Sequence, residues 1–150
     1  MKKLLLIALI LLLGFSYLKT HNIPLTNDIS FQEANPTEVG SDEIIAQAFA
    51  NQVSDVQVAG QGIVVKMLSD DLKGRQHQRF IIKLGTGQTL LVAHNIDLAP
   101  RLDNLQIGDT VQFNGVYEWG EKGGLIHWTH RDPNGSHPAG WLKFQGKTYQ

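Results

Sequence analysis

From residue 56 onward, the chain consists of short runs in which apolar and polar residues alternate, separated by glycine-rich or polar segments. Alternation with a period of two residues is typical of β-strands that bury one face. Gly85, Thr86 and Gly87 fit a tight hairpin turn between two such runs. Gly60 and Gly62 interrupt the first run, and glycines inside a strand commonly mark a bulge or a sharp bend. Five strands are therefore predicted, at 58–67, 77–84, 89–94, 110–117 and 125–129.

The order and spacing of these strands predict the fold class. Five strands with a longer connection, 95–108, between the third and the fourth predict a mainly β protein, namely a small five-stranded OB-like barrel. Ser41 can cap one short N-terminal helix, and Ile45 and Ala48 lie on the same face of that helix. We therefore expect the helix to cover one end of the sheet. The predicted core consists of Val64, Phe80, Ile82, Leu90, Val92, Val111, Phe113 and Ile126.

The first 20 residues have the pattern of an export segment. Lys2 and Lys3 precede an apolar stretch of signal-peptide length. That stretch is shorter than the roughly 20 apolar residues of a spanning helix, which favours a cleaved signal over a permanent inner-membrane anchor at residues 4–18. Both alternatives predict export, to the periplasm or beyond, and membrane contact arises only through an uncleaved segment. The predicted organisation is an export segment at 1–20, a linker at 21–40 and a single barrel domain at 41–150.

Cysteine content and charge restrict the chemistry. The chain contains no cysteine, which excludes disulfides, thiolate metal sites and a lipidated cysteine after the signal. Residues 21–55 contain acids but neither lysine nor arginine, whereas residues 56–150 carry a small excess of bases. Non-specific nucleic-acid binders usually show a stronger basic bias, so the charge neither supports nor excludes that partner.

Two runs concentrate polar and titratable residues: HNIDLAPR at 94–101 and GGLIHWTHRDPNGSH at 123–137. Together with HQRF at 77–80 and GW at 140–141, these strings resemble an uncharacterised family of small exported bacterial proteins. The resemblance covers about residues 60–149. It implies membership of that family, a domain of unknown function, and it assigns neither an activity nor a catalytic residue.

The second run can bring several imidazoles together. On a strand at 125–129, His127 lies on the face opposite Ile126 and Trp128, which are predicted to be core residues. Residues 132–135 fit a type I turn that would return the chain toward the strand end. A divalent metal such as zinc, held there, would activate water or polarise a phosphoryl oxygen. The predicted metal ligands are His127, His130 and His137, with Asp132 or His94 as a further ligand.

A metal-free mechanism is the alternative. A histidine can act as general base while Arg79, Arg101 or Arg131 stabilises an anionic transition state. His77 and Arg79 share one face of a predicted strand, and with Trp141 they are the predicted substrate contacts. The predicted catalytic residues are His94, Arg101, His127, His130, Asp132 and His137.

Each candidate residue also has a structural interpretation. Asp132 can accept hydrogen bonds within its own turn, and His94 can organise the loop that follows it. Trp119, Trp128 and Trp141 suit packing as well as ligand stacking. Three functions therefore stay open: a histidine-dependent, nuclease-like hydrolase of phosphodiesters, a non-catalytic module that binds an oligonucleotide or an oligosaccharide, and a structural envelope protein.

Overall fold

The computed structural model describes residues 36–150, and the side chains of residues 40–150. The predicted export segment and most of the predicted linker lie outside these residues, so their roles stay predictions. Within the described part of the chain, no helix is long and apolar enough to cross a membrane.

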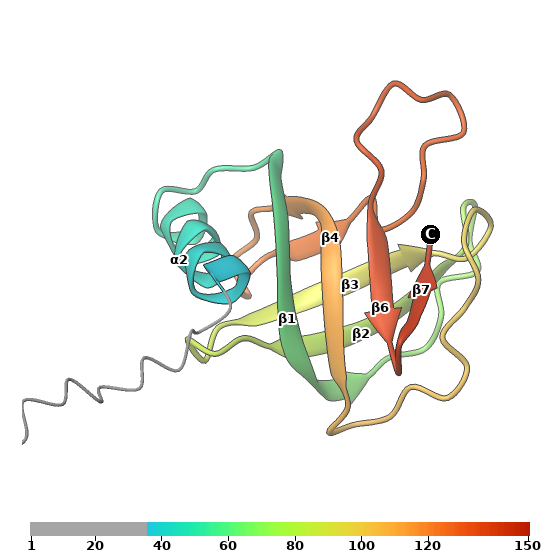
Figure 1. Cartoon of the computed structure of the whole chain (residues 1–150), viewed down its shortest axis with the longest axis horizontal. Coiled ribbons are helices and arrows are strands. Elements are labelled where there is room, and N and C mark those ends of the chain that lie inside the picture. The colour runs from blue at the N-terminus through green and yellow to red at the C-terminus, as the bar shows by residue number, and fades with distance from the viewer. Residues whose placement is uncertain (1–35) are drawn as a thin grey trace, which may run out of the picture. The chain divides into compact units, whose positions relative to one another are not determined.

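A closed barrel of five strands is the centre of the fold (Figure 1). The first strand pairs with the second and with the fourth, and the third runs parallel to the fifth, which also pairs with the fourth. This closed order confirms the predicted OB-like barrel. The elements are α2 (Pro36–Ala50), β1 (Val56–Met67), β2 (His77–Lys83), β3 (Thr89–Asn95), β4 (Thr110–Glu118), β5 (Leu125–His127), β6 (Trp141–Phe144) and β7 (Lys147–Tyr149).

The barrel encloses the predicted core. All eight predicted core side chains are buried, and none is more than 1 % exposed. The alternation in β2 shows why, because its burial pattern places Gln78, Phe80 and Ile82 inside and His77 and Arg79 on the outer face. The period-two pattern therefore predicted the inward face of these strands correctly.

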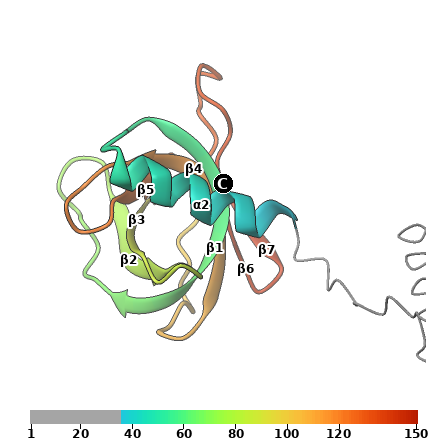
Figure 2. The ribbon, with the colours of Figure 1, turned by 90° about the vertical axis from the view of Figure 1, so that its left-hand side faces the viewer.

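Helix α2 covers one end of the barrel, as Figure 2 shows. Ile45 and Ala48 are buried and belong to the same apolar cluster as the strands, which confirms the predicted helix face. The predicted start of the helix was wrong, because Ser41 lies inside α2 and the helix begins at Pro36. Proline suits the first helical position, where its missing N–H costs nothing.

The two glycines of β1 were expected to mark a bulge or a sharp bend, and the bulge lies after them. The register with β2 shifts between Val64 and Lys66, after both glycines. A Cβ at Gly60 would lie 2.9 Å from the ring of Phe113, and a Cβ at Gly62 would lie 3.0 Å from Ile82. Both glycines therefore leave room for core side chains.

Two features of the C-terminal third differ from the sequence prediction. Strand β5 ends at His127 rather than at residue 129, and Trp128 has a φ of 52°, so the predicted alternation stops there. Trp128 is consequently half-buried outside the core cluster, whereas Thr129 is fully buried. The hairpin β6–β7 was not predicted; it pairs with β4 and adds Leu142 and Tyr149 to the core.

Candidate functional site

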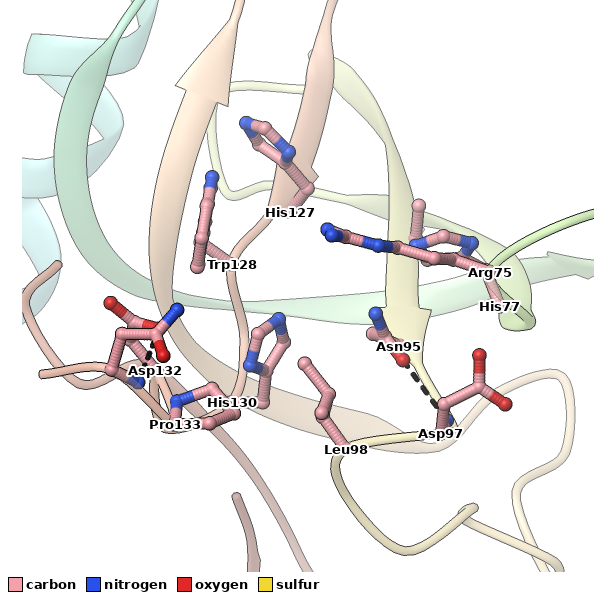
Figure 3. Close-up of a pocket in the computed structure, with 12 residues that line it drawn as sticks. Arg75, His77, Asn95, Asp97, Leu98, His127, Trp128, His130, Asp132 and Pro133 are labelled. Atoms are coloured by element: carbon pink, nitrogen blue, oxygen red, sulfur yellow. Dashed lines mark hydrogen bonds between the residues drawn. The ribbon is translucent and has the colours of Figure 1, made fainter. Parts of the chain in front are cut away.

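A cleft of about 620 Å³ opens where β2 begins and where β3 and β5 end (Figure 3). We call it the histidine cleft. Its wall combines four residues of β2, β3 and β5 with the loops before β2, after β3 and after β5. The side chains that matter for its chemistry are Arg75, His77, His127, Trp128, His130 and Asp132.

His127 reaches the cleft because it stands on the outer face of β5, as the strand pattern predicted. Its Nε2 lies 3.4 Å from Oε1 of Glu118 on the paired strand β4, but it makes no hydrogen bond and is shielded from solvent. Burial lowers the pKa of His127, and the Glu118 carboxylate opposes this shift. The neutral imidazole therefore leaves a polar nitrogen unpaired in this conformation.

His130 presents one nitrogen to the cleft. Its Nδ1 lies 2.7 Å from the carbonyl oxygen of Arg131, and a carbonyl only accepts, so Nδ1 carries the proton. The basic nitrogen of the neutral ring is then Nε2, which makes no hydrogen bond to the described residues. His130 lines the cleft (Figure 3) but is only 5 % exposed. Its burial and its hydrogen bond to the Arg131 carbonyl together fix the orientation of the ring.

Trp128 is held in an unfavourable backbone conformation. A φ of 52° is left-handed, and a bulky residue there costs about 1–3 kcal/mol. Its indole stacks on His137 with 4.3 Å between ring centroids and an angle of 6°, and lies 5.3 Å from the His130 ring. Gly140 permits this turn, because a Cβ there would lie 1.8 Å from the Trp128 carbonyl oxygen. The fold thus holds the Trp128 indole at the wall of the cleft at the cost of strain in the Trp128 backbone.

The carboxylate of Asp132 is fully occupied by its own loop. Its two oxygens accept hydrogen bonds from the backbone N–H groups of Asn134, Ser136 and His137 and from the Ser136 hydroxyl, at 2.7–3.0 Å. The predicted turn at 132–135 is present, since Gly135 N–H donates to the Asp132 carbonyl. These bonds, led by the Ser136 hydroxyl, lower the pKa of Asp132 to about 2. Asp132 therefore orders the loop that carries His137.

His94 lies in the interior and does not line the cleft. Its Nε2 lies 3.1 Å from the Pro100 carbonyl oxygen, so Nε2 carries the proton and Nδ1 accepts from the Thr129 hydroxyl at 2.8 Å. Burial lowers the pKa of His94 to about 4. Both nitrogens of this neutral ring are thus used to join β3, the following loop and Thr129.

The other predicted contacts also lie outside the cleft lining. Arg101 pairs with Asp70 at 2.9 Å, which raises its pKa, and also with Asp103. Arg79 donates two hydrogen bonds to the Ser69 carbonyl. Trp141 lies on β6 with the Lys143 ammonium 4.3 Å from its ring. Of the predicted substrate contacts, His77 is the one that the structure places in the cleft.

The strings HQRF and HNIDLAPR fasten the β3–β4 connection to the barrel. The buried amide of Gln78 donates to the Leu102 carbonyl and accepts from the Leu102 N–H, both at 2.9 Å. Asn95 Oδ1 accepts from the Asp97 N–H, and the Asp97 carboxylate accepts from the Gln76 N–H. Most polar groups of these strings are therefore satisfied by the protein itself.

The predicted metal centre does not assemble in this arrangement. In the part of the chain that the structure describes, no group of three or more His, Asp or Glu side chains could hold a metal ion. His127 and His130 line the cleft, whereas His137 lies behind Trp128 in a stack. The Nδ1 of His137 is also engaged, 2.8 Å from the Pro138 carbonyl oxygen.

Arg75 is a cleft residue that the sequence analysis missed. It is exposed, lies two residues before His77, and in Figure 3 its side chain extends into the cleft with the guanidinium on the side of His127. The available signal was its position at the end of the polar loop 69–76, directly before a strand that begins with a histidine. A loop sequence does not predict where its side chains point. Arg75 is therefore identified as a cleft residue only once the loop is folded.

Fold and cleft together define a small OB-like barrel with a histidine-lined cleft at one end. The model of the family described as "Protein of unknown function (DUF3465)" matches residues 26–150, and the chain belongs to this family. The match confirms the resemblance to an uncharacterised family that the sequence strings indicated. No curated protein matches the sequence.

Proposed function

We propose that the histidine cleft binds single-stranded nucleic acid, with a phosphate beside Arg75 and His77 and a base on the Trp128 indole. The observation that carries this proposal is the strained Trp128, held by stacking on His137 at the wall of a cleft that also contains a guanidinium. Strained residues persist where the surrounding structure holds them, and they cluster at ligand sites. Aromatic rings beside cationic groups are the usual combination for single strands.

The charges of the cleft support an anionic ligand. Both of its carboxylates accept hydrogen bonds from backbone N–H groups: Asp97 from Gln76 in the β1–β2 loop, and Asp132 from its own loop. Arg75 forms no ion pair among the described residues, and three imidazoles share its cleft. A phosphate in the cleft would therefore meet one permanent positive charge, that of the Arg75 guanidinium.

A binding titration tests this proposal. Fluorescence anisotropy of a labelled oligothymidylate should show saturable binding to the full-length protein, and binding should weaken as salt rises. Arg75→Ala and Trp128→Gly should each weaken binding about tenfold or more, the usual loss for a phosphate or a stacking contact. Glycine is chosen because it tolerates the positive φ without the ring.

Lys122→Ala supplies the matched control. Lys122 is exposed in the turn before β5 and does not line the cleft, so this variant should bind as the parent protein does. Equal weakening by Lys122→Ala and Arg75→Ala would reduce the binding to general charge attraction. Absence of binding at low salt would refute the proposal.

Metal-free phosphodiester cleavage is the second candidate, and one observation favours it. The Nδ1 proton of His130 is fixed on a backbone carbonyl, so Nε2 is set to accept a proton from a group in the cleft. With RNA, Nε2 would take the proton of the 2′-hydroxyl, its oxygen would bond to phosphorus, and the 5′-oxygen would leave with a proton from a second imidazole, that of His77. Arg75 would stabilise the charge on the phosphoryl oxygens.

Cleavage is distinguishable from binding. RNA incubated with the protein and a chelator should yield a 2′,3′-cyclic phosphate, single-stranded DNA should stay intact, and His130→Gln should abolish the product. Intact RNA between about pH 5 and 8, the range in which imidazoles titrate, would exclude this candidate and leave the binding proposal untouched.

A further inference from the structure

A second depression lies on the outer face of the sheet, mainly over β1, β4, β6 and β7, and none of these four strands lines the histidine cleft. Two adjacent hollows, of about 460 and 420 Å³, share Gln61 and Thr110. In Figure 1 the strands β1, β4, β6 and β7 lie side by side across this face. We call the joined hollows the amide groove. Its polar lining is Gln61, Lys83, Thr110, Gln112, Lys143, Gln145 and Thr148.

Strand register aligns this lining in a row. Gln61 of β1 is opposite Gln112 of β4, Gln112 is opposite Lys143 of β6, and Lys143 is opposite Thr148 of β7. Directly opposed residues on one face have side chains about 5 Å apart, so four polar side chains form a continuous line across four strands. A second line runs from Lys83 through Ile63 to Thr110.

The groove carries positive charge without a compensating carboxylate in its lining. Among the described residues, neither Lys83 nor Lys143 forms an ion pair. The Lys143 ammonium lies 4.3 Å from the centroid of the Trp141 ring, which holds it at the rim. The carboxylate of Asp42 lies beside Gly85 at the far end, so an anionic ligand is favoured on the Lys143 side.

The lining suits sugars better than bases. Amide and hydroxyl side chains both donate and accept hydrogen bonds, which matches the hydroxyl groups of a saccharide. The aromatic residue of the lining is Phe144, which is 5 % exposed, so it offers no face for a base to stack on. Single-stranded nucleic acid relies on such stacking, and this groove lacks it among its described lining residues.

We propose that the amide groove binds an anionic polysaccharide, with sugar hydroxyls on Gln61, Gln112 and Thr148 and a carboxylate or sulfate on Lys143. This site is separate from the histidine cleft and does not depend on the function proposed for it. The ligand lies across the strands, along the row that the register sets up.

Calorimetric titration of the full-length protein with polygalacturonate oligomers tests the proposal, beside a neutral dextran of equal length and an oligothymidylate. Polygalacturonate should bind, and dextran should bind at least about tenfold more weakly because it offers no partner for Lys143. Lys143→Gln and Gln112→Ala should each reduce the affinity by about tenfold, whereas Lys122→Gln, outside the groove, should not.

Three results would overturn the proposal: no binding of polygalacturonate, equal binding of dextran, or equal effects of Lys143→Gln and Lys122→Gln. Oligothymidylate binding that Lys143→Gln removes would assign the groove to nucleic acid instead. Arg75→Ala and Trp128→Gly separate the two sites, because they should leave polygalacturonate binding unchanged. Unaltered thermal melting of Lys143→Gln, an exposed residue, confirms that the fold is intact.

Discussion

The runs 94–101 and 123–137 both concentrate polar and titratable residues, yet the fold uses them differently. His94 is buried and both its nitrogens are bonded within the protein. In the second run, His127 and His130 line a cleft. The Nε2 of His127 makes no hydrogen bond but lies buried, 3.4 Å from Glu118, whereas only the Nδ1 of His130 is bonded. A density of titratable residues therefore does not identify a site, because the partners and the burial of each nitrogen decide whether it can meet a ligand.

The largest expected effect is on stability, from the first run. His94→Ala removes a buried ring and leaves the Thr129 hydroxyl and the Pro100 carbonyl without their partner. We expect a loss of about 3–5 kcal/mol in the free energy of unfolding, measured by urea denaturation. His137→Ala, on the half-buried stack, should lose less than about half of that. Equal losses of stability in His94→Ala and His137→Ala would contradict the assignment of His94 as the more structural residue.

A pH titration of stability follows from the same residue. Burial lowers the pKa of His94 in the folded state to about 4, while the unfolded chain has the ordinary value of 6.5. The unfolded state therefore binds the extra proton between these values, so stability is full above pH 6.5 and falls as the pH drops toward 4. The expected loss is about 3 kcal/mol, and an isosteric His94→Gln variant should show a flatter profile.

The second run should respond in the opposite way, with little effect on stability. Trp128→Gly removes the indole from the stack but relieves the left-handed strain. We expect these to offset each other to within about 1 kcal/mol in thermal melts, while oligothymidylate binding weakens about tenfold or more. A large destabilisation with unchanged binding would make Trp128 a structural residue and reverse the comparison.

The smallest expected effect comes from Asp132→Asn. The change removes the charge but keeps an amide oxygen that can accept from backbone N–H groups of the same turn. Because the carboxylate contacts solvent, we expect a slight decrease in the melting temperature near neutral pH. No difference is expected below about pH 2, where the carboxyl of the parent protein is uncharged, as the asparagine amide is. A loss of ligand binding as large as that of Arg75→Ala would assign Asp132 to the site.

Much of the fold could be predicted from the sequence because its signals are local. The eight core residues followed from alternation, and the turn at 132–135 from its Asp, Pro and Gly. Two local departures were harder to predict. The positive φ of Trp128 ends the alternation directly after β5. The β6–β7 hairpin is short, with strands of only four and three residues. Both depend on contacts with β4 and with Gly140, which lie far along the chain or across the sheet.

The candidate site was only partly predictable, for a related reason. The sequence identified the two runs and placed His127 on an outer face, and family membership followed from the same strings. The sequence could not show that His94 is buried and bonded while His130 lines the cleft. Each histidine stands near the end of a predicted strand and is followed by polar residues. The sequence also missed Arg75, whose approach to the cleft depends on how the β1–β2 loop folds.

By itself, then, the sequence determined the mainly β barrel, its inward face and the residues available for chemistry, because periodicity and turn preferences act over a few neighbouring residues. The tertiary structure alone decided which imidazoles are bonded and which are free. Hydrogen-bond partners such as Thr129 for His94, 35 positions apart, come together only when β3 and β5 pair in the closed barrel. Closure of the barrel therefore sets the difference between the two runs.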